Sequence, residues 1–257
     1  MRREEESLPF KRDRLILWLD PYLAESDSTW LTAELDYWLE KGVSLVIVNN
    51  QAHFSMLRGK KVISIAGPWL YTFNQWALAY YIEQGVQAFI PPYEISRQDL
   101  YRLTEYLPAQ FFAPIVFAYP DLFRIRADLS KKYGQANFID RENNTFRLIG
   151  KRDYSVVVPE RPFSITDLVP NLKKQGFRRF IVDLSNAEPS KGLYRDIARA
   201  VDQGSSLLNT TRFNWKEGFW SEETIRRDAS KDDSKDASIN KKPKSPPYAQ
   251  RRQSRTR

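Results

Sequence analysis

Short apolar runs of strand length alternate along the chain with amphipathic stretches that have helical spacing. The apolar runs cover residues 14–20, 43–50, 61–67, 86–92, 114–119 and 179–185. The helical stretches cover residues 29–41, 73–85, 96–107, 121–134, 164–175 and 192–204. Several of them end at a glycine just before the next run, which is typical of β-α units with parallel strands. The pattern predicts an α/β fold, and it favours an incomplete TIM-like (β/α) barrel over a doubly wound sheet.

Two segments depart from this alternation. Residues 136–158 predict antiparallel strands around the turn Glu142-Asn143-Asn144, so we expect a β-hairpin inserted into the barrel. Residues 221–257 contain hardly any apolar side chain and cannot offset the entropy lost on ordering, which predicts a disordered C-terminal tail. We therefore divide the chain into a charged N-terminal segment (1–13), a barrel-like domain (14–220) and a basic tail (221–257).

The cysteine content narrows the classes of function. The chain contains no cysteine, which excludes disulfides, zinc–thiolate sites, iron–sulfur clusters and a cysteine nucleophile, and which fits a reducing compartment. Its charged start lacks the apolar core of a signal peptide, and no apolar run reaches the ~20 residues that cross a bilayer. We expect a cytoplasmic protein without a membrane span.

The positive charge is unevenly placed along the chain. Of the net charge of +8, residues 221–257 carry +5, so the rest of the chain is nearly balanced. Charge concentrated in a tail raises non-specific affinity for phosphates without encoding sequence specificity. The tail therefore predicts, at most, non-specific contact with RNA.

Five segments carry a resemblance to a known family, and they occur in the family's order. They read GPWLYTFNQWALAYYIEQGVQAFIPPYEIS (67–96), PIVFAYPDLFRIRADL (114–129), FIDRENNTFRL (138–148), FRRFIVDLSN (177–186) and TTRFNWKEGFW (210–220). Together they resemble the later half of the U32 peptidase family, the collagenase-like group of unassigned catalytic type. The resemblance spans residues 43–220, and it implies a barrel-like fold with an active face at the carboxyl ends of the strands.

The resemblance also sets expectations for function. Family members divide into reported proteases and hydroxylases that act on RNA bases or quinone precursors. The hydroxylases hold an iron–sulfur cluster with cysteines, which this chain lacks, so we expect no cofactor. Two functions of the family remain open for this chain. It is either a peptidase-like hydrolase or a non-catalytic protein that binds a substrate. The alternatives are an RNA-associated accessory protein that uses its tail, or a subunit whose barrel a partner chain completes, because the family's opening strand is not recognisable.

The resemblance implies a ligand site, for which five residues are candidates: Tyr71, Asn74, Glu94, Asp140 and Asp183. Asn74 and Glu94 follow predicted strands at the end where barrel enzymes bind substrates, and Glu94 is the candidate general base. Tyr71 lies with Trp69 in a loop, where exposed rings could stack on a planar ligand. As structural alternatives, Asn74 caps a helix, and Glu94 occupies the first turn of one.

The other two acidic candidates also have structural alternatives. Asp140 either binds a ligand or holds the hairpin to the barrel. Asp183 ends an apolar run, and a buried carboxylate there would need a partner, for which the sequence offers Arg124, Arg126 or Arg212.

The chain has a single histidine, His53. It supplies one metal ligand where such sites need several, and no Gly-Xaa-Ser-Xaa-Gly motif accompanies it. We therefore expect no metal site and assign His53 to packing or to the surface.

Overall fold

The computed structural model describes residues 11–23, 25–134, 137–151, 154–188 and 190–212. It shows a mixed α/β fold, as the alternation of apolar and helical stretches predicts. The predicted tail (221–257) lies outside the described residues, as do most of the predicted N-terminal segment and the last eight residues of the predicted domain. Within the described part, no helix is both long enough and apolar enough to cross a bilayer.

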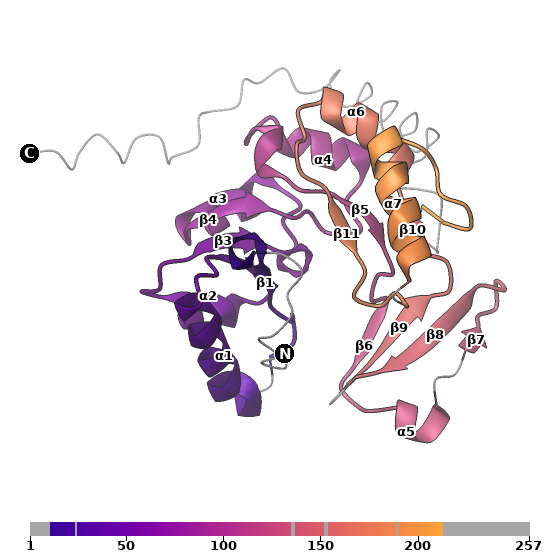
Figure 1. Cartoon of the computed structure of the whole chain (residues 1–257), viewed down its shortest axis with the longest axis horizontal. Coiled ribbons are helices and arrows are strands. Elements are labelled where there is room, and N and C mark those ends of the chain that lie inside the picture. Colours follow the sequence, from indigo (N-terminus) through magenta and orange to yellow (C-terminus); the bar gives the residue numbers. More distant parts are fainter. Residues whose placement is uncertain (1–10, 24, 135–136, 152–153, 189, 213–257) are drawn as a thin grey trace, which may run out of the picture.

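The first half of the chain forms a parallel sheet in the order β1-β2-β3-β4. Its strands are β1 (Ile16–Trp18), β2 (Leu45–Val48), β3 (Ile63–Ala66) and β4 (Val86–Phe89). The connecting helices are α1 (Ser28–Glu40), α2 (Gln51–Leu57) and α3 (Gln75–Glu83) (Figure 1). Helix α2 was not predicted, because its seven residues are too few to show a helical period.

The parallel series continues beyond β4. After helix α4 (Arg97–Leu103), strand β5 (Ile115–Ala118) pairs in parallel with β11 (Ile181–Asp183). The amide of Ala113 donates to the carbonyl oxygen of Phe89 at 2.8 Å, and Phe89 forms a parallel bridge with Phe112, so β5 runs in the direction of β4. The carboxyl ends of all these strands therefore point to one side of the molecule. Among the described residues, β11 does not pair with β1, so the series stays open.

A second, antiparallel sheet interrupts the series between β5 and β11. Its strands are β6 (Phe123–Ile125), β7 (Asn137–Ile139), β8 (Thr145–Gly150) and β9 (Ser155–Pro159), paired in the order β6-β9-β8-β7. We call these four strands the inserted sheet; Figure 1 shows it below β5 and β11. The predicted hairpin is confirmed as β7 and β8, and it is part of a larger unit.

The predicted helix 121–134 is wrong. Residues 123–125 form β6, and only the short helix α5 (Ser130–Tyr133) lies in the rest of this range. Phe123 pairs with Val157 of the fully buried strand β9, and this pairing outweighs the helical spacing of the local sequence. The predicted helix 164–175 also begins later, because Phe163–Ser164 form strand β10, antiparallel to β5. It becomes α6 (Val169–Lys174), and the chain continues through β11 to helix α7 (Lys191–Gln203).

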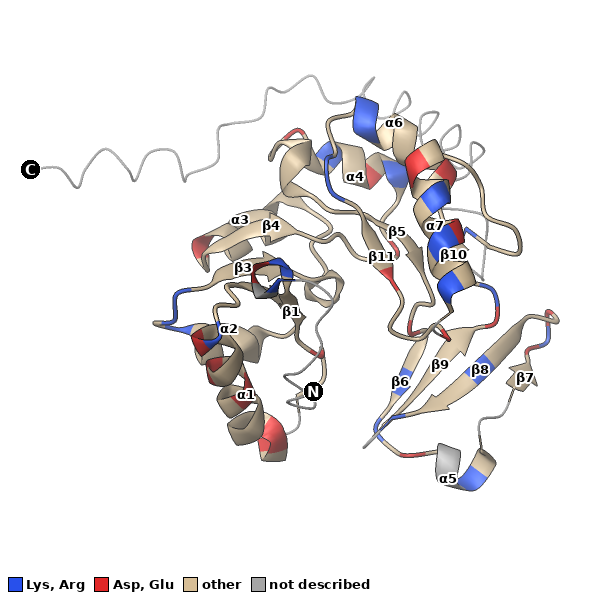
Figure 2. Cartoon of the chain, viewed as in Figure 1, with Lys and Arg blue, Asp and Glu red and all other residues tan. Residues whose placement is uncertain are grey.

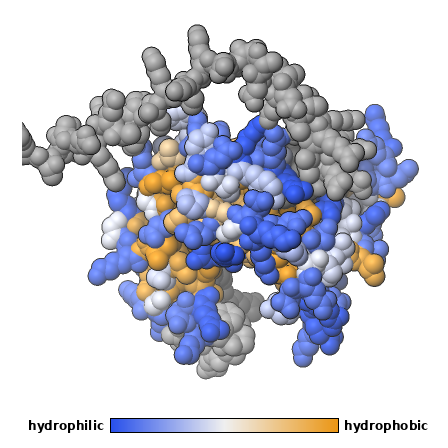
Figure 3. All heavy atoms as spheres, turned by 90° about the horizontal axis from the view of Figure 1, so that it is seen from above, coloured by the Kyte–Doolittle hydropathy of each residue, from blue (hydrophilic) through white to orange (hydrophobic). Residues whose placement is uncertain are grey.

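The core lies between the parallel strands and their helices. Val46, Val48 and Val116 of the strands are fully buried, and Leu35 and Leu100 pack on them from α1 and α4. Burying a side chain of this size contributes about 1.5–3 kcal/mol. Figure 3, a view from above, shows that hydrophobic residues also reach the surface on the side that holds β1–β4 in Figure 1. The ends of the strands are thus fixed on a rigid support.

Candidate functional site

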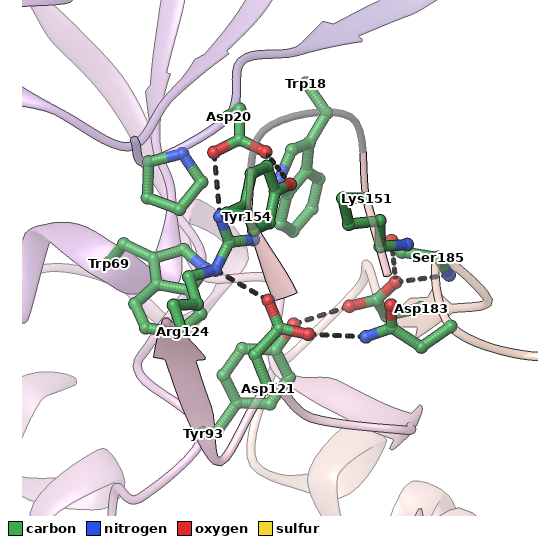
Figure 4. Close-up of a pocket in the computed structure, with 12 residues that line it drawn as sticks. Trp18, Asp20, Trp69, Tyr93, Asp121, Arg124, Lys151, Tyr154, Asp183 and Ser185 are labelled. Carbon is green, nitrogen blue, oxygen red and sulfur yellow. Dashed lines mark hydrogen bonds and ion pairs between the residues drawn. The ribbon is translucent and has the colours of Figure 1, made fainter. Parts of the chain in front are cut away.

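A pocket opens at the carboxyl ends of the parallel strands. Its volume is about 170 Å³, and residues from both sheets line it: Trp18, Asp20, Pro21, Trp69, Tyr93, Asp121, Arg124, Lys151, Tyr154, Asp183, Ser185 and Asn186. Asp20, Trp69, Tyr93 and Asp121 follow β1, β3, β4 and β5, and Asp183 ends β11. Figure 4 shows that three carboxylates, Asp20, Asp121 and Asp183, converge there. The described residues hold no group of three or more side chains arranged to bind a metal ion.

Asp183 accepts hydrogen bonds on both carboxylate oxygens. The Tyr93 hydroxyl donates to Oδ2 at 2.5 Å, and the amide of Ser185 donates to Oδ1 at 2.9 Å; the Ser185 hydroxyl also contacts Oδ1. Burial raises the pKa of Tyr93 well above its ordinary value, and the charge of Asp183 raises it further. Tyr93 therefore stays protonated and remains a hydrogen-bond donor to Asp183.

Asp121 lies deeper in the pocket, with its side chain 7% exposed. Arg124 Nε donates to its Oδ2 at 2.6 Å, and Asn186 Nδ2 donates to its Oδ1 at 2.5 Å. Burial raises the pKa of Asp121 and outweighs the opposing effect of Arg124, while the charge of Asp183 adds to the rise. Asp121 thus holds a proton more tightly than an exposed aspartate does.

Arg124 connects the inserted sheet to the end of β1. Its Nη1 donates to Asp20 Oδ1 at 2.8 Å, and the hydroxyl of Tyr154 donates to Asp20 Oδ2 at 2.7 Å. The guanidinium lies over the rings of Trp69 and Tyr154, 5.2 Å from each centroid. Burial, with the hydrogen bond to Asp20, raises the pKa of Tyr154 to about 12. One arginine therefore holds two carboxylates and two rings at one wall of the pocket.

The five candidate residues from the sequence do not all lie in one place in the structure. Asp183 lines the pocket. Tyr71 follows β3 and Glu94 follows β4, so both lie on the same side of the molecule, but neither lines the pocket. They are close to each other: the pKa of Tyr71 is raised by burial and then by the charge of Glu94.

Asn74 and Asp140 have structural contacts outside the pocket. Asn74 Oδ1 accepts from the amides of Trp76 and Ala77, both at 3.0 Å, and so caps α3, as the structural alternative expects. Asp140 is exposed, and its pKa is lowered first by the hydrogen bond from Asn144 Nδ2 at 3.0 Å and then by those from the backbone amides of Asn144 and Glu142 at 2.9 and 2.8 Å. Its hydrogen bonds hold its own turn, not the hairpin to the parallel strands.

The expected arginine partner of Asp183 is not found. Arg124 pairs with Asp20 and Asp121, Arg212 pairs with Asp167, and Arg126 lies over the ring of Tyr22. Hydrogen bonds from Tyr93 and Ser185 satisfy Asp183 instead.

His53 lies in the core with no exposed surface. Its Nδ1 accepts from the amide of Asn49 at 3.2 Å, and Nε2 has no hydrogen-bond partner in the part of the chain that the structure describes. Burial lowers its pKa to about 4, against a smaller opposing effect of Asp20. His53 is therefore neutral at pH 7 and packs in the core.

Sequence reasoning missed the pocket residues Asp20, Tyr93, Asp121, Arg124 and Tyr154. A signal exists for Asp20 and Asp121, because each follows an apolar run closely, where a parallel strand delivers its side chains to the binding edge. Arg124 and Tyr154 carry no local signal. They reach the pocket only through the pairing of β6 with β9.

Comparison with known proteins gives little further information. No protein-family model matches the chain, and no curated protein sequence matches it. One solved structure with similarity is the chitinase-like agglutinin from Robinia pseudoacacia, with 9% sequence identity and a TM-score of 0.31. The match covers 73% of this chain and 91% of the agglutinin, and this TM-score is too low to establish a shared fold.

Proposed function

We propose that this chain is a diverged relative of the U32 peptidases, with an incomplete TIM-like barrel, and that it hydrolyses a peptide substrate in the pocket at the carboxyl ends of its strands. The open parallel series β1-β2-β3-β4 followed by β5 and β11 supports the barrel. In barrel enzymes the active site lies at this end of the strands. One observation carries the proposal: Asp121 and Asp183 face the same pocket from neighbouring strands, in different environments.

Two carboxyl groups in unlike surroundings suit general acid–base hydrolysis. Asp183 accepts the proton of a water molecule that attacks the scissile carbonyl carbon. Asp121, whose pKa burial raises, donates a proton to the leaving amine as the carbon–nitrogen bond breaks. Lys151 also lines the pocket, and its ammonium group would stabilise the negative charge that develops on the carbonyl oxygen, while the hydroxyl of Tyr93 holds Asp183 in place.

A second candidate is binding without catalysis. The ion pair between Arg124 and Asp121 favours it, because the guanidinium stabilises the charged carboxylate and opposes the effect of burial on its pKa. In that case the pocket recognises the same polar substrate and leaves it intact.

Hydrolysis of fluorescein-labelled casein distinguishes the two candidates. We expect Asp183→Asn and Asp121→Asn each to lower the rate by about 100-fold or more, because each removes a proton-transfer group. Asp202→Asn, which changes an exposed carboxylate on α7, serves as the matched control and should keep the wild-type rate. Melting temperatures of all three variants report whether the fold survives. Wild-type rates in both pocket variants would falsify the acid–base proposal.

A further inference from the structure

A row of aromatic rings leads from the pocket to the surface. The ring centroids of Tyr93 and Trp69 are 6.3 Å apart, those of Trp69 and Tyr71 are 6.4 Å apart, and those of Tyr71 and Phe73 are 6.2 Å apart. We call these four residues the aromatic row. Its inner end, Tyr93, donates to Asp183, and its outer members Tyr71 and Phe73 are 49% and 37% exposed. The row thus connects the proposed catalytic carboxylate with solvent.

The outer part of the row depends on an uncommon backbone conformation. Tyr71 has φ 51° and ψ 52°, the left-handed region, which a bulky residue rarely adopts. This conformation sets its ring nearly parallel to that of Phe73, at 17°. Half of the Tyr71 surface remains in solvent, so burial does not account for the strain. Tyr71 ends the short 3-10 helix Pro68–Leu70, where a left-handed residue is common, so this conformation fixes the place of the ring without itself indicating a ligand.

The segment that carries the aromatic row does not favour a polyanion. No lysine, arginine or histidine occurs between Val62 and Ser96, whereas Glu83 and Glu94 do. Figure 2 shows the same absence on α3 and β4. Arg124 lies over Trp69, but it is engaged by Asp20 and Asp121. Single-stranded nucleic acids need cations along their path in addition to stacking rings, so the row does not suit RNA.

The spacing of the rings is close to the side-chain repeat of an extended polypeptide. In a β-strand, side chains on one face follow each other at about 6.4–6.8 Å, twice the rise per residue. Successive centroids of the aromatic row lie 6.2–6.4 Å apart. We propose that the aromatic row binds an extended polypeptide whose apolar side chains alternate with polar ones, and guides it into the pocket. This inference rests on the proposed function and names the class of peptide that the pocket receives.

Fluorescence anisotropy tests the proposal with a fluorescein-labelled ten-residue peptide of alternating leucine and serine. The full chain carries Asp183→Asn, so that the peptide stays intact. Tyr71→Gly removes the ring and keeps the backbone, because glycine adopts positive φ without strain. We expect Tyr71→Gly and Phe73→Ala each to weaken peptide binding by about tenfold with an unchanged melting temperature. Tyr194→Ala, an exposed ring on α7, is the control and should not change the affinity.

Three results would overturn the aromatic row as a peptide site. The first is the absence of detectable peptide binding at concentrations up to about 1 mM. The second is an unchanged affinity in Tyr71→Gly and Phe73→Ala. The third is tighter binding of oligo(U) or cellohexaose than of the peptide. The test of catalysis is independent of the test of peptide binding. If casein hydrolysis does not depend on Asp183 while Tyr71→Gly still weakens peptide binding, the row stands and the assignment of the carboxylates falls.

Discussion

At the scale of single residues, burial sets the proton affinity of the side chains in and below the pocket. Asp121 and His53 are both withdrawn from water, with opposite consequences. The charged form of each is disfavoured, so the pKa of the carboxyl group rises and that of the imidazole falls. Asp121 thereby holds its proton more tightly than an exposed aspartate does. His53 stays neutral and is only a packing residue until the solution becomes acidic.

His53 makes the fold sensitive to acid. Its pKa is about 4 in the folded chain against 6.5 when unfolded, so between these values the unfolded chain binds a proton that the folded chain refuses. Stability is therefore lost as the pH falls, by up to about 3 kcal/mol between pH 7 and pH 4. Urea denaturation of wild type and His53→Gln checks this. The difference in unfolding free energy between them should shrink as the pH falls. A difference that does not vary with pH would contradict the assignment.

At the scale of elements, the ends of the first three strands are joined below the pocket. Asn49, which follows β2, donates through Nδ2 to the carbonyl oxygen of Leu19 at 2.8 Å, and its Oδ1 accepts from the amide of Trp69 at 3.5 Å. Gly67 makes room for this side chain, since a Cβ there would lie 1.9 Å from Asn49 Oδ1. The position of Trp69, and with it the wall of the pocket, depends on this close approach.

Gly67→Ala should therefore disrupt both the fold and the pocket. The added methyl group must displace the buried Asn49, and such overpacking costs about 1–3 kcal/mol or more. Gly192→Ala is a suitable control, because the nearest atom to its new Cβ is 3.9 Å away and the position lies in α7. We expect the control to change stability by less than about 1 kcal/mol in chemical denaturation. Equal effects of the two variants would show that Gly67 has no special steric role.

Arg124 is one of the links between the inserted sheet and the end of β1, and removing its side chain should loosen the inserted sheet. Arg124→Ala leaves Asp20 and Asp121 without their shared donor, which costs about 1.5–3 kcal/mol for a hydrogen bond to a charged group. Hydrogen exchange in β6 and β9 should become faster. Arg199→Ala removes an exposed arginine whose partner is Asp196, and it should cost less than about 1 kcal/mol. Unchanged exchange in β6 and β9 would mean that other contacts hold the inserted sheet.

The sequence predicts elements well where local pattern and tertiary role agree. The runs at 43–50 and 61–67 became parallel strands, and Asn74 became the helix cap that its structural alternative expects. Residues 121–125 were misassigned because their partner, β9, is distant in the sequence. Arg124 and Tyr154 were missing from the predicted site because their positions also depend on contacts distant in the sequence. These contacts join the inserted sheet to the end of β1.

At the scale of the whole molecule, the excess positive charge and the residues of the pocket lie in different parts of the chain. The pocket draws on residues 18–186, and its three aspartates outnumber its two cations, Arg124 and Lys151. Residues 221–257 hold eleven Lys and Arg against six Asp and Glu. The two regions therefore suit different partners: a pocket rich in carboxylates repels phosphates, whereas the basic segment attracts them.

Deletion of residues 221–257 should consequently separate RNA contact from pocket function. Because counterion release scales with the number of cations that meet phosphates, the deletion should weaken affinity for a single-stranded oligo(U) by about tenfold or more at low salt. It should also make that affinity less dependent on salt. Casein hydrolysis and the melting temperature should not change, because the pocket and the core lie before residue 221. Anisotropy titrations at several salt concentrations measure the first effect. RNA affinity that survives the deletion would assign the contact to the remaining, nearly neutral part of the chain.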